Sequence, residues 1–236
     1  MKSLIITIAI LFPTLCFAQV DSALDNTQPA QSQPAASDVQ LASATVNNDP
    51  LIKPKGMWAG NASKFFQGAA IGFLGHESGH LIANCALNTH LYLKSVNYGP
   101  IPFFTIEPGK PLNHREHYIT ASAGFNAQNI INECILTQHP NLSAEDEPTL
   151  KGIASFNFWL AAGYAASAFT KTGPDERDTK GMADSLGWNE RWIGVMILVP
   201  TALDTYRYKH PDAKWAVTAS RLSKLAMIAL ALDAED

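Results

Sequence analysis

The stretch Phe73-Leu74-Gly75-His76-Glu77-Ser78-Gly79-His80-Leu81-Ile82 decides how the rest of the chain is interpreted. It lies in the run Met57 to Leu87, which is rich in Ala, Phe, Ile, Leu and Gly and in which Lys64 is the only Lys or Arg. An apolar run of this length without proline is typical of a buried helix. The sequence therefore predicts one long helix that carries two histidines and a glutamate at its centre.

The two histidines have the spacing of a helical metal site. Residues four apart lie on the same face of an α-helix, so His76 and His80 can present two imidazole nitrogens to one cation. The carboxylate of Glu77 then lies beside them, where it can take a proton from a metal-bound water and later return it to a leaving amine. The spacing predicts a Zn²⁺ site with Glu77 as the catalytic base, against the alternative of two histidines and a glutamate with a structural role.

Catalytic zinc sites usually take a third protein ligand, and the sequence offers two candidates. Asp204 is favoured, because it ends an apolar helix behind Pro200, where a carboxylate is costly to bury unless it meets a cation. Glu133 is the rival, since it lies on the polar stripe of another apolar helix. The alternative for Asp204 is an ion pair with Arg207 at the helix end.

The flanking segments predict a mostly α fold with one small β-hairpin. Short runs with Tyr, Val, Ile and Phe between Leu91 and Pro111, cut by Asn, Gly and Pro, indicate a hairpin directly after the motif helix. His114-Arg115-Glu116-His117 is interpreted as a solvated turn. Further helices are expected over Tyr118–Gln138, Gly152–Thr170, Trp192–Leu203 and Ala213–Leu232, with a polar loop over Lys171–Asn189.

The composition favours a membrane and disfavours nucleic acid. Hydrophobic residues make up 47% of the 236 residues and charged residues 16%, well below the roughly 25% of a soluble domain. The Gly152–Thr170 run is charge-free and long enough to cross a bilayer, which takes about 20 apolar residues. We therefore expect a membrane-embedded helical bundle rather than the buried core of a soluble α-rich domain. The formal net charge of -4 gives no basic surface for nucleic acid.

The N-terminal segment predicts export. Residues 1–18 combine Lys2 with an apolar core and end in Ala18, as a secretory signal peptide does. Residues 19–55 have the composition of a disordered polar tether, and residues 56–236 form the expected helical metallopeptidase-like domain. Cys85 and Cys134 then remain in a compartment that permits disulfides, where they either pair or never meet. The expected location is the membrane of the cell envelope, or otherwise the periplasm.

The order of these features resembles the site-2 protease family of intramembrane zinc metallopeptidases. The motif helix, the strand-like Leu91–Ile106, the segment Ala123-Gly124-Phe125-Asn126 and the segment Pro200-Thr201-Ala202-Leu203-Asp204 follow one another as their counterparts do in that family. The resemblance implies a zinc ion held by His76, His80 and Asp204, and a role for Asn126 in positioning the substrate backbone.

The sequence thus predicts a zinc metallopeptidase that hydrolyses a peptide or a membrane-protein substrate within or at a membrane. Two alternatives remain open at this stage. One is a soluble periplasmic zinc peptidase of the thermolysin-like kind with Glu133 as third ligand, and the other is a non-enzymatic membrane or envelope protein.

Overall fold

The motif helix is the longest element of the fold. The computed structural model describes residues 55–98 and 101–234, of which 61–234 belong to one compact unit. Helix α2 (Lys55–Ala86) carries both histidines on uninterrupted helical backbone. Its end is fixed by Asn84, whose side chain donates to the carbonyl of His80 at 2.9 Å and accepts from the Thr89 hydroxyl at 2.6 Å. The predicted motif helix is confirmed.

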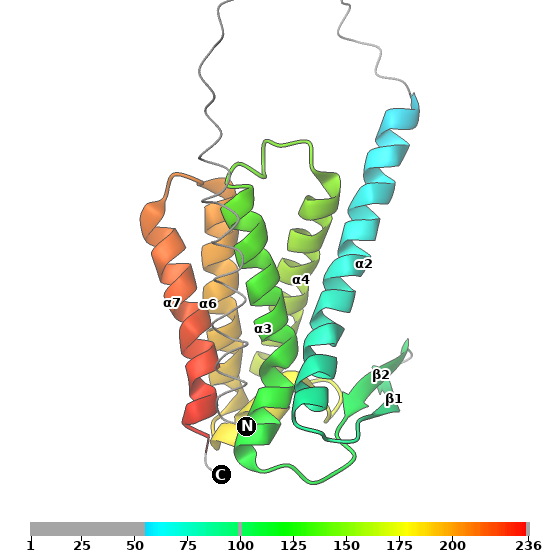
Figure 1. Cartoon of the computed structure of the whole chain (residues 1–236), viewed down its shortest axis with the longest axis vertical. Coiled ribbons are helices and arrows are strands. Elements are labelled where there is room, and N and C mark those ends of the chain that lie inside the picture. The colour runs from blue at the N-terminus through cyan, green and yellow to red at the C-terminus, as the bar shows by residue number, and fades with distance from the viewer. Residues whose placement is uncertain (1–54, 99–100, 235–236) are drawn as a thin grey trace, which may run out of the picture. The chain divides into compact units, whose positions relative to one another are not determined.

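The predicted hairpin follows directly. Strands β1 (Tyr92–Tyr98) and β2 (Ile101–Glu107) pair antiparallel, with Leu93 opposite Ile106 and Lys94 opposite Thr105. The hairpin lies beside the C-terminal end of α2 (Figure 1). Gly109 donates its backbone N–H to the Thr89 carbonyl at 2.8 Å, which ties the chain after β2 back to the end of α2.

The remaining elements are helical, as predicted, but the helix expected to end at Leu203 continues through Asp204 to Lys209, and two other segments also differ. Helix α3 starts before Tyr118, since Asn113 and Glu116 form a reciprocal capping box at its start. The His114–His117 segment is therefore the first turn of a helix and not a solvated turn. The expected polar loop also contains a short helix, which ends at Gly187 with φ of 64°. The helices are α3 (His114–Gln138), α4 (Pro148–Thr170), α5 (Asp178–Leu186), α6 (Glu190–Lys209) and α7 (Lys214–Ala229), followed by a 3-10 turn at Leu230–Leu232.

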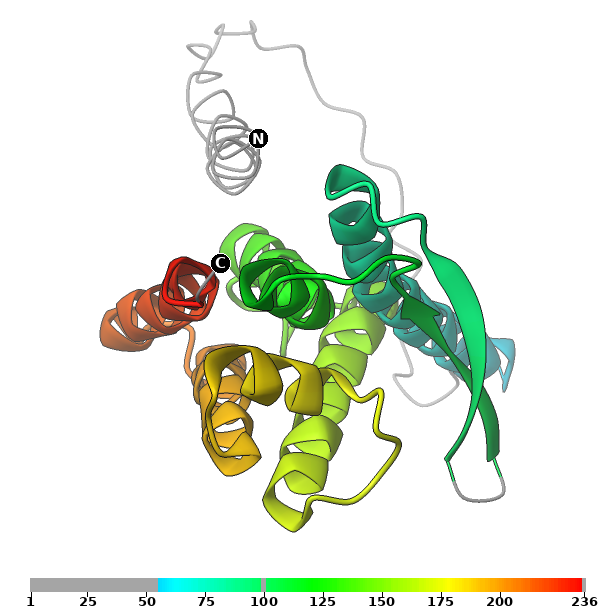
Figure 2. The same ribbon diagram turned by 90° about the horizontal axis from the view of Figure 1, so that it is seen from below.

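The long helices form a bundle that is closed at one end by α5. Figure 1 shows α3, α4, α6 and α7 standing side by side, and Figure 2 shows α5 lying across the end of the bundle. The main apolar core joins α3, α5, α6 and α7, and its largest members are Tyr118, Phe125, Met182, Ile193 and Met227. Tyr118 also donates its hydroxyl to the Met227 carbonyl at 2.7 Å. This core holds α5 at a fixed place against α3.

Helix α2 packs against α3 and α4 through glycines. A Cβ placed on Gly68 would lie 2.0 Å from the Thr149 carbonyl oxygen, and one on Gly79 would lie 2.3 Å from that of Ala123. Contacts this short require glycine, since a real Cβ stays roughly 3.5 Å from such atoms. Small residues at helix crossings let backbones approach closely, and the approach at Gly79 brings the motif next to α3.

One described helix, Lys214–Leu232, is long and apolar enough to cross a membrane by length and composition, with 22% of its apolar window buried. The Gly152–Thr170 segment forms most of α4 but does not meet the same criterion. Cys85 and Cys134 form no disulfide with each other. The predicted signal peptide at 1–18 and nearly all of the predicted tether at 19–55 lie outside the described residues.

Candidate metal centre

Three potential metal ligands converge at the end of the bundle nearest α5. The Nε2 atoms of His76 and His80 lie 3.2 Å apart, and Oδ2 of Asp178 lies 3.2 Å from the first and 3.3 Å from the second. Both histidines are almost completely buried, with exposed fractions of 1% and 8%. Within the described residues, these two histidines and one aspartate are the side chains whose ligand atoms lie close enough together to hold one metal ion.

The spacing of these atoms fits zinc. In a tetrahedral site with bonds of about 2.0 to 2.1 Å, neighbouring ligand atoms are roughly 3.3 Å apart. The three observed separations of 3.2 to 3.3 Å match one face of such a tetrahedron. Two imidazoles and one carboxylate are also a ligand set of catalytic rather than structural zinc, since the fourth position stays open.

The two imidazole rings are held in place by α3 and α4. Nδ1 of His80 lies 2.8 Å from the Thr120 carbonyl oxygen and must donate to it, so Nε2 is the ring nitrogen that faces the site and would be the ligand atom. The ring of His76 packs against Phe125 and Tyr164, with centroids 5.4 and 5.8 Å away. These contacts fix ring orientations that α2 alone leaves open.

The carboxylate of Asp178 is ionised in this setting. Burial opposes its ionisation, but the charge of His80 and hydrogen bonds from His76 and His80 outweigh burial and hold the pKa of Asp178 well below its ordinary value. Asp178 is the first residue of α5, and its negative charge at a helix N-terminus is itself favourable. A carboxylate ligand must be deprotonated, so this group is in the state that a cation requires.

Gly124 of α3 leaves the space in front of the histidines open. A Cβ at this position would lie 2.4 Å from Cε1 and 2.5 Å from Nε2 of His76, and 2.5 Å from Nε2 of His80. Any larger residue would therefore press on the nitrogens that face the site.

Glu77 and two of the three candidate ligands, His80 and Asp178, line an apolar cavity. The half-buried Glu77 lies at a cavity of about 420 Å³ together with His80 and Asp178. The walls come from β2 on one side and from α4 on the other, with Phe104, Thr105, Ile106, Trp159, Leu160, Gly163 and Tyr164 among the lining residues. The cavity is large enough for an apolar side chain of a substrate next to the metal ligands.

A second cavity adjoins the first and shares His80 and Asp178 with it. It has a volume of about 240 Å³ and reaches His80 and Asp178 from a more polar direction, past Glu107, His117 and Asp184. The ligands therefore border a polar cavity as well as an apolar one.

Asp204, which the sequence favoured as third ligand, lies elsewhere. It is 1% exposed and belongs to a buried ion network in which Arg207 approaches Oδ1 at 3.1 Å and Lys224 approaches Oδ2 at 2.8 Å. Ser220 also donates to Oδ1 at 2.5 Å. The structure therefore does not bring Asp204 to His76 and His80, where the neighbouring carboxylate is that of Asp178. The carboxylate of Asp204 meets cationic side chains instead.

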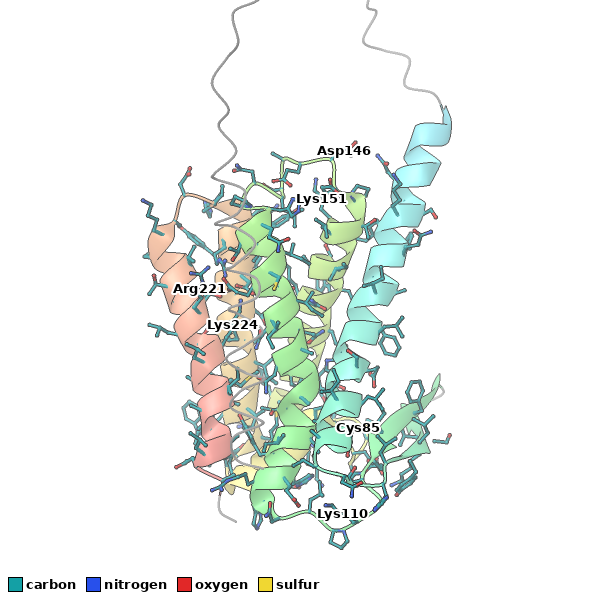
Figure 3. All side chains as sticks on the ribbon, in the orientation of Figure 1. Cys85, Lys110, Asp146, Lys151, Arg221 and Lys224 are labelled. Atoms are coloured by element: carbon teal, nitrogen blue, oxygen red, sulfur yellow. The ribbon has the colours of Figure 1, made fainter. Side chains whose placement is uncertain are left out.

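Glu133, the rival ligand, belongs to the same network. It accepts hydrogen bonds from Arg207 at 2.6 and 3.2 Å and from Arg221 at 2.8 Å, and Lys224 lies 2.9 Å away. Figure 3 labels Arg221 and Lys224 on α7, which supplies these cations. The network links α3, α6 and α7, and it removes Glu133 as a third ligand.

Asn126 also has no place at the described cavities beside the metal site. Its amide donates to the Ser122 hydroxyl at 3.2 Å, one turn earlier on α3, and it is not among the residues that line either cavity. The role in substrate positioning that the resemblance implied is therefore not matched by the position of this side chain.

Sequence reasoning missed Asp178 because nothing local distinguishes it. The segment Gly173-Pro174-Asp175-Glu176-Arg177-Asp178 contains three carboxylates in a turn-rich loop, where exposed acidic residues are ordinary. The one available signal was the concentration of acids between two apolar helices. Only the packing of α5 on α3 selects Asp178 among them.

Comparisons with known proteins add no relative: no family model, no curated protein and no solved structure matches this chain.

Proposed function

We propose that this protein is a zinc metallopeptidase that hydrolyses peptide bonds at the cavity between β2 and α4. The observation that carries the proposal is the triangle formed by Nε2 of His76, Nε2 of His80 and Oδ2 of Asp178, with sides of 3.2 to 3.3 Å. These three residues would hold the ion. A bound zinc ion supplies the Lewis acidity that polarises a peptide carbonyl and a water molecule.

Glu77 is the proposed catalytic base. It follows His76 directly and lines the same cavity as His80 and Asp178, so its carboxylate can take a proton from the attacking water and pass it to the leaving amine. The adjoining polar cavity, which His80 and Asp178 also line, has room for the attacking water. A scaffold role for the motif accounts for neither the converging carboxylate of Asp178 nor the two cavities.

The hairpin is the proposed binding element for an extended substrate. Strand β2 pairs with β1 on one edge, and within the described residues the sheet has only these two strands. An extended peptide can add to the other edge through main-chain hydrogen bonds, while its side chains occupy pockets. The apolar lining then favours substrates with large apolar residues near the cleaved bond.

We also propose that the bundle lies in a membrane of the cell envelope, delivered there by the N-terminal signal. Large apolar side chains are exposed along several helices. Soluble proteins rarely expose so many of them, and a large exposed apolar surface is typical of a membrane or protein contact. Within the α-helices, the most exposed are Phe66 and Leu74 of α2, Trp159 of α4, Trp192 of α6, and Trp215 and Leu222 of α7.

The tryptophans of α6 and α7 support the same placement. Trp192 lies near the start of α6, and Trp215 lies at the start of the following helix α7, so they mark opposite ends of this helix pair. The 20 residues of α6 span about 30 Å and match the thickness of a bilayer hydrocarbon core by length alone, whereas Lys214–Leu232 matches it in length and composition. Tryptophans at both ends of such a span are typical of membrane interfaces, and the charges of the buried network face the bundle interior as they do in membrane proteins.

The test is metal analysis and proteolysis with the full chain purified in detergent. Wild type is expected to contain one zinc per chain and to cleave unstructured apolar peptides, and Glu77→Gln is expected to keep the zinc and lose cleavage. His76→Ala and Asp178→Ala are expected to lose both. Zinc-loaded wild type without hydrolysis, or equal hydrolysis by Glu77→Gln, would refute the peptidase assignment.

A further inference from the structure

The residues on both sides of Asp178 are bound to one carboxylate, that of Glu190. Arg177 donates from Nε to Oε1 at 2.7 Å and from Nη2 to Oε2 at 2.6 Å, and Thr179 donates its hydroxyl to Oε1 at 2.7 Å. Glu190 is the first residue of α6, so these bonds join the start of α5 to the start of α6. The backbone of Asp178 is thereby fixed from both sides.

These groups are buried, which makes their arrangement specific. The side chains of Arg177 and Glu190 are 9% and 7% exposed, and Thr179 is fully buried. A second bond closes the loop before the ligand, because Nη1 of Arg177 donates to the Pro174 carbonyl at 2.9 Å. A buried ion pair contributes little net stability compared with apolar packing, so stability alone is a weak reason for this arrangement.

Asp178 needs its backbone fixed by neighbouring groups more than the two histidines do. His76 and His80 come from the interior of one long helix, whereas Asp178 begins a nine-residue helix after the loop that follows α4. Metal–ligand distances tolerate deviations of only about 0.2 Å. A ligand at the end of a loop meets that tolerance only when its backbone is held by neighbouring groups.

On the basis of the proposed zinc site, we propose that Glu190 is a positioning residue, whose carboxylate fixes Asp178 as third ligand by binding Arg177 and Thr179. Glu190 itself does not belong to the three converging ligands. It acts through its two partners, in the way that groups behind metal ligands orient them.

The test compares two matched variants of the full chain in detergent. Glu190→Gln removes the charge from this Arg–carboxylate pair. Glu133→Gln removes the charge from another, because Glu133 also accepts two bonds from one arginine, Arg207. Zinc affinity is measured by competition with a chromogenic chelator, ligand geometry by the visible absorption of the Co²⁺-substituted protein, and stability by thermal unfolding of the metal-free protein.

Glu190→Gln is expected to weaken zinc binding by about 10-fold to 100-fold, the usual effect of losing a group behind a metal ligand, and to change the cobalt spectrum. Glu133→Gln is expected to lower the unfolding temperature and leave zinc affinity and the spectrum at wild-type values. The same zinc affinity and spectrum in Glu190→Gln as in wild type would overturn the positioning role.

A second variant, Thr179→Val, tests the same proposal where Glu190→Gln does not fold. Thr179→Val keeps the shape of the side chain and removes one of the three bonds to Glu190, so zinc affinity is expected to fall by a smaller factor, on the order of 10-fold. Wild-type affinity in Thr179→Val would then refute the proposal. A wild-type protein that binds no zinc at all would instead refute the proposed function, and the positioning role with it.

Discussion

The substitution Gly124→Ala tests the metal centre without touching any proposed ligand. The added methyl carbon would lie 2.4 to 2.5 Å from three ring atoms of His76 and His80. Carbon and nitrogen atoms that are not bonded prefer separations of roughly 3.5 Å. The rings, the α3 backbone or both must therefore move apart by about 1 Å, five times the roughly 0.2 Å that metal ligands tolerate.

This displacement should abolish tight zinc binding. Losing a group behind one ligand typically costs 10-fold to 100-fold in affinity. Displacing two ligands at once is therefore expected to weaken zinc affinity by at least about 100-fold. Peptide hydrolysis should fall in parallel, because the same nitrogens hold the ion that hydrolysis requires.

Gly163→Ala is the matched control. Gly163 also lies in a long helix and lines the cavity beside the site, but a Cβ there meets no atom within 4 Å. Zinc affinity should therefore stay at the wild-type value, and stability should rise by about 0.5 to 1 kcal/mol, because glycine is unfavourable within a helix. Chelator competition gives the affinities, and circular dichroism verifies that both variants fold. Equal zinc affinity in Gly124→Ala and Gly163→Ala would show that the ion, if bound, is not where we place it.

Three further predictions concern the surroundings of the site. Asp204→Ala should lower the free energy of unfolding by about 3 to 5 kcal/mol, the usual cost of removing one partner of a buried ion pair. The folded fraction should still contain one zinc per chain. A loss of zinc with unchanged stability would restore Asp204 as a ligand. Gly163→Phe should fill part of the 420 Å³ cavity and raise KM for peptides with a large apolar residue more than for matched peptides with alanine. An equal change of KM for both peptides would place the substrate elsewhere. The wild-type protein should stay in the membrane fraction after washing with carbonate at high pH and leave it only with detergent, whereas release by the wash would contradict membrane embedding.

Much of the fold could be predicted from periodicity and composition. The motif helix, the hairpin after it and the later apolar helices appear as expected, because long apolar runs and clustered Gly and Pro report local structure directly. Helix α5 was missed, since its nine residues of mixed polarity lie within a loop-like stretch. Its position depends on packing against α3, which no local pattern records.

The candidate site was only half predictable for the same reason. His76, Glu77 and His80 share one helix, so their spacing alone implies their common face. The third ligand is a carboxylate from a distant segment, and the cost of burying an acid does not identify it among the acids of the chain. Asp204 is buried and Glu133 is half-buried, but Arg207, Arg221 and Lys224 neutralise them. Which acid meets which cation is decided by the helix arrangement in three dimensions.

The separation of the ligands along the chain bears on biosynthesis. His76 and Asp178 are 102 residues apart, so the ribosome has completed α2, the hairpin, α3 and α4 before the last ligand is made. A nascent chain that holds only the two histidines grips a metal ion weakly and has no complete cavity around it. Under the proposed function, peptide hydrolysis can therefore begin only after about three quarters of the 236 residues have been made, which shields the emerging polypeptide from the site.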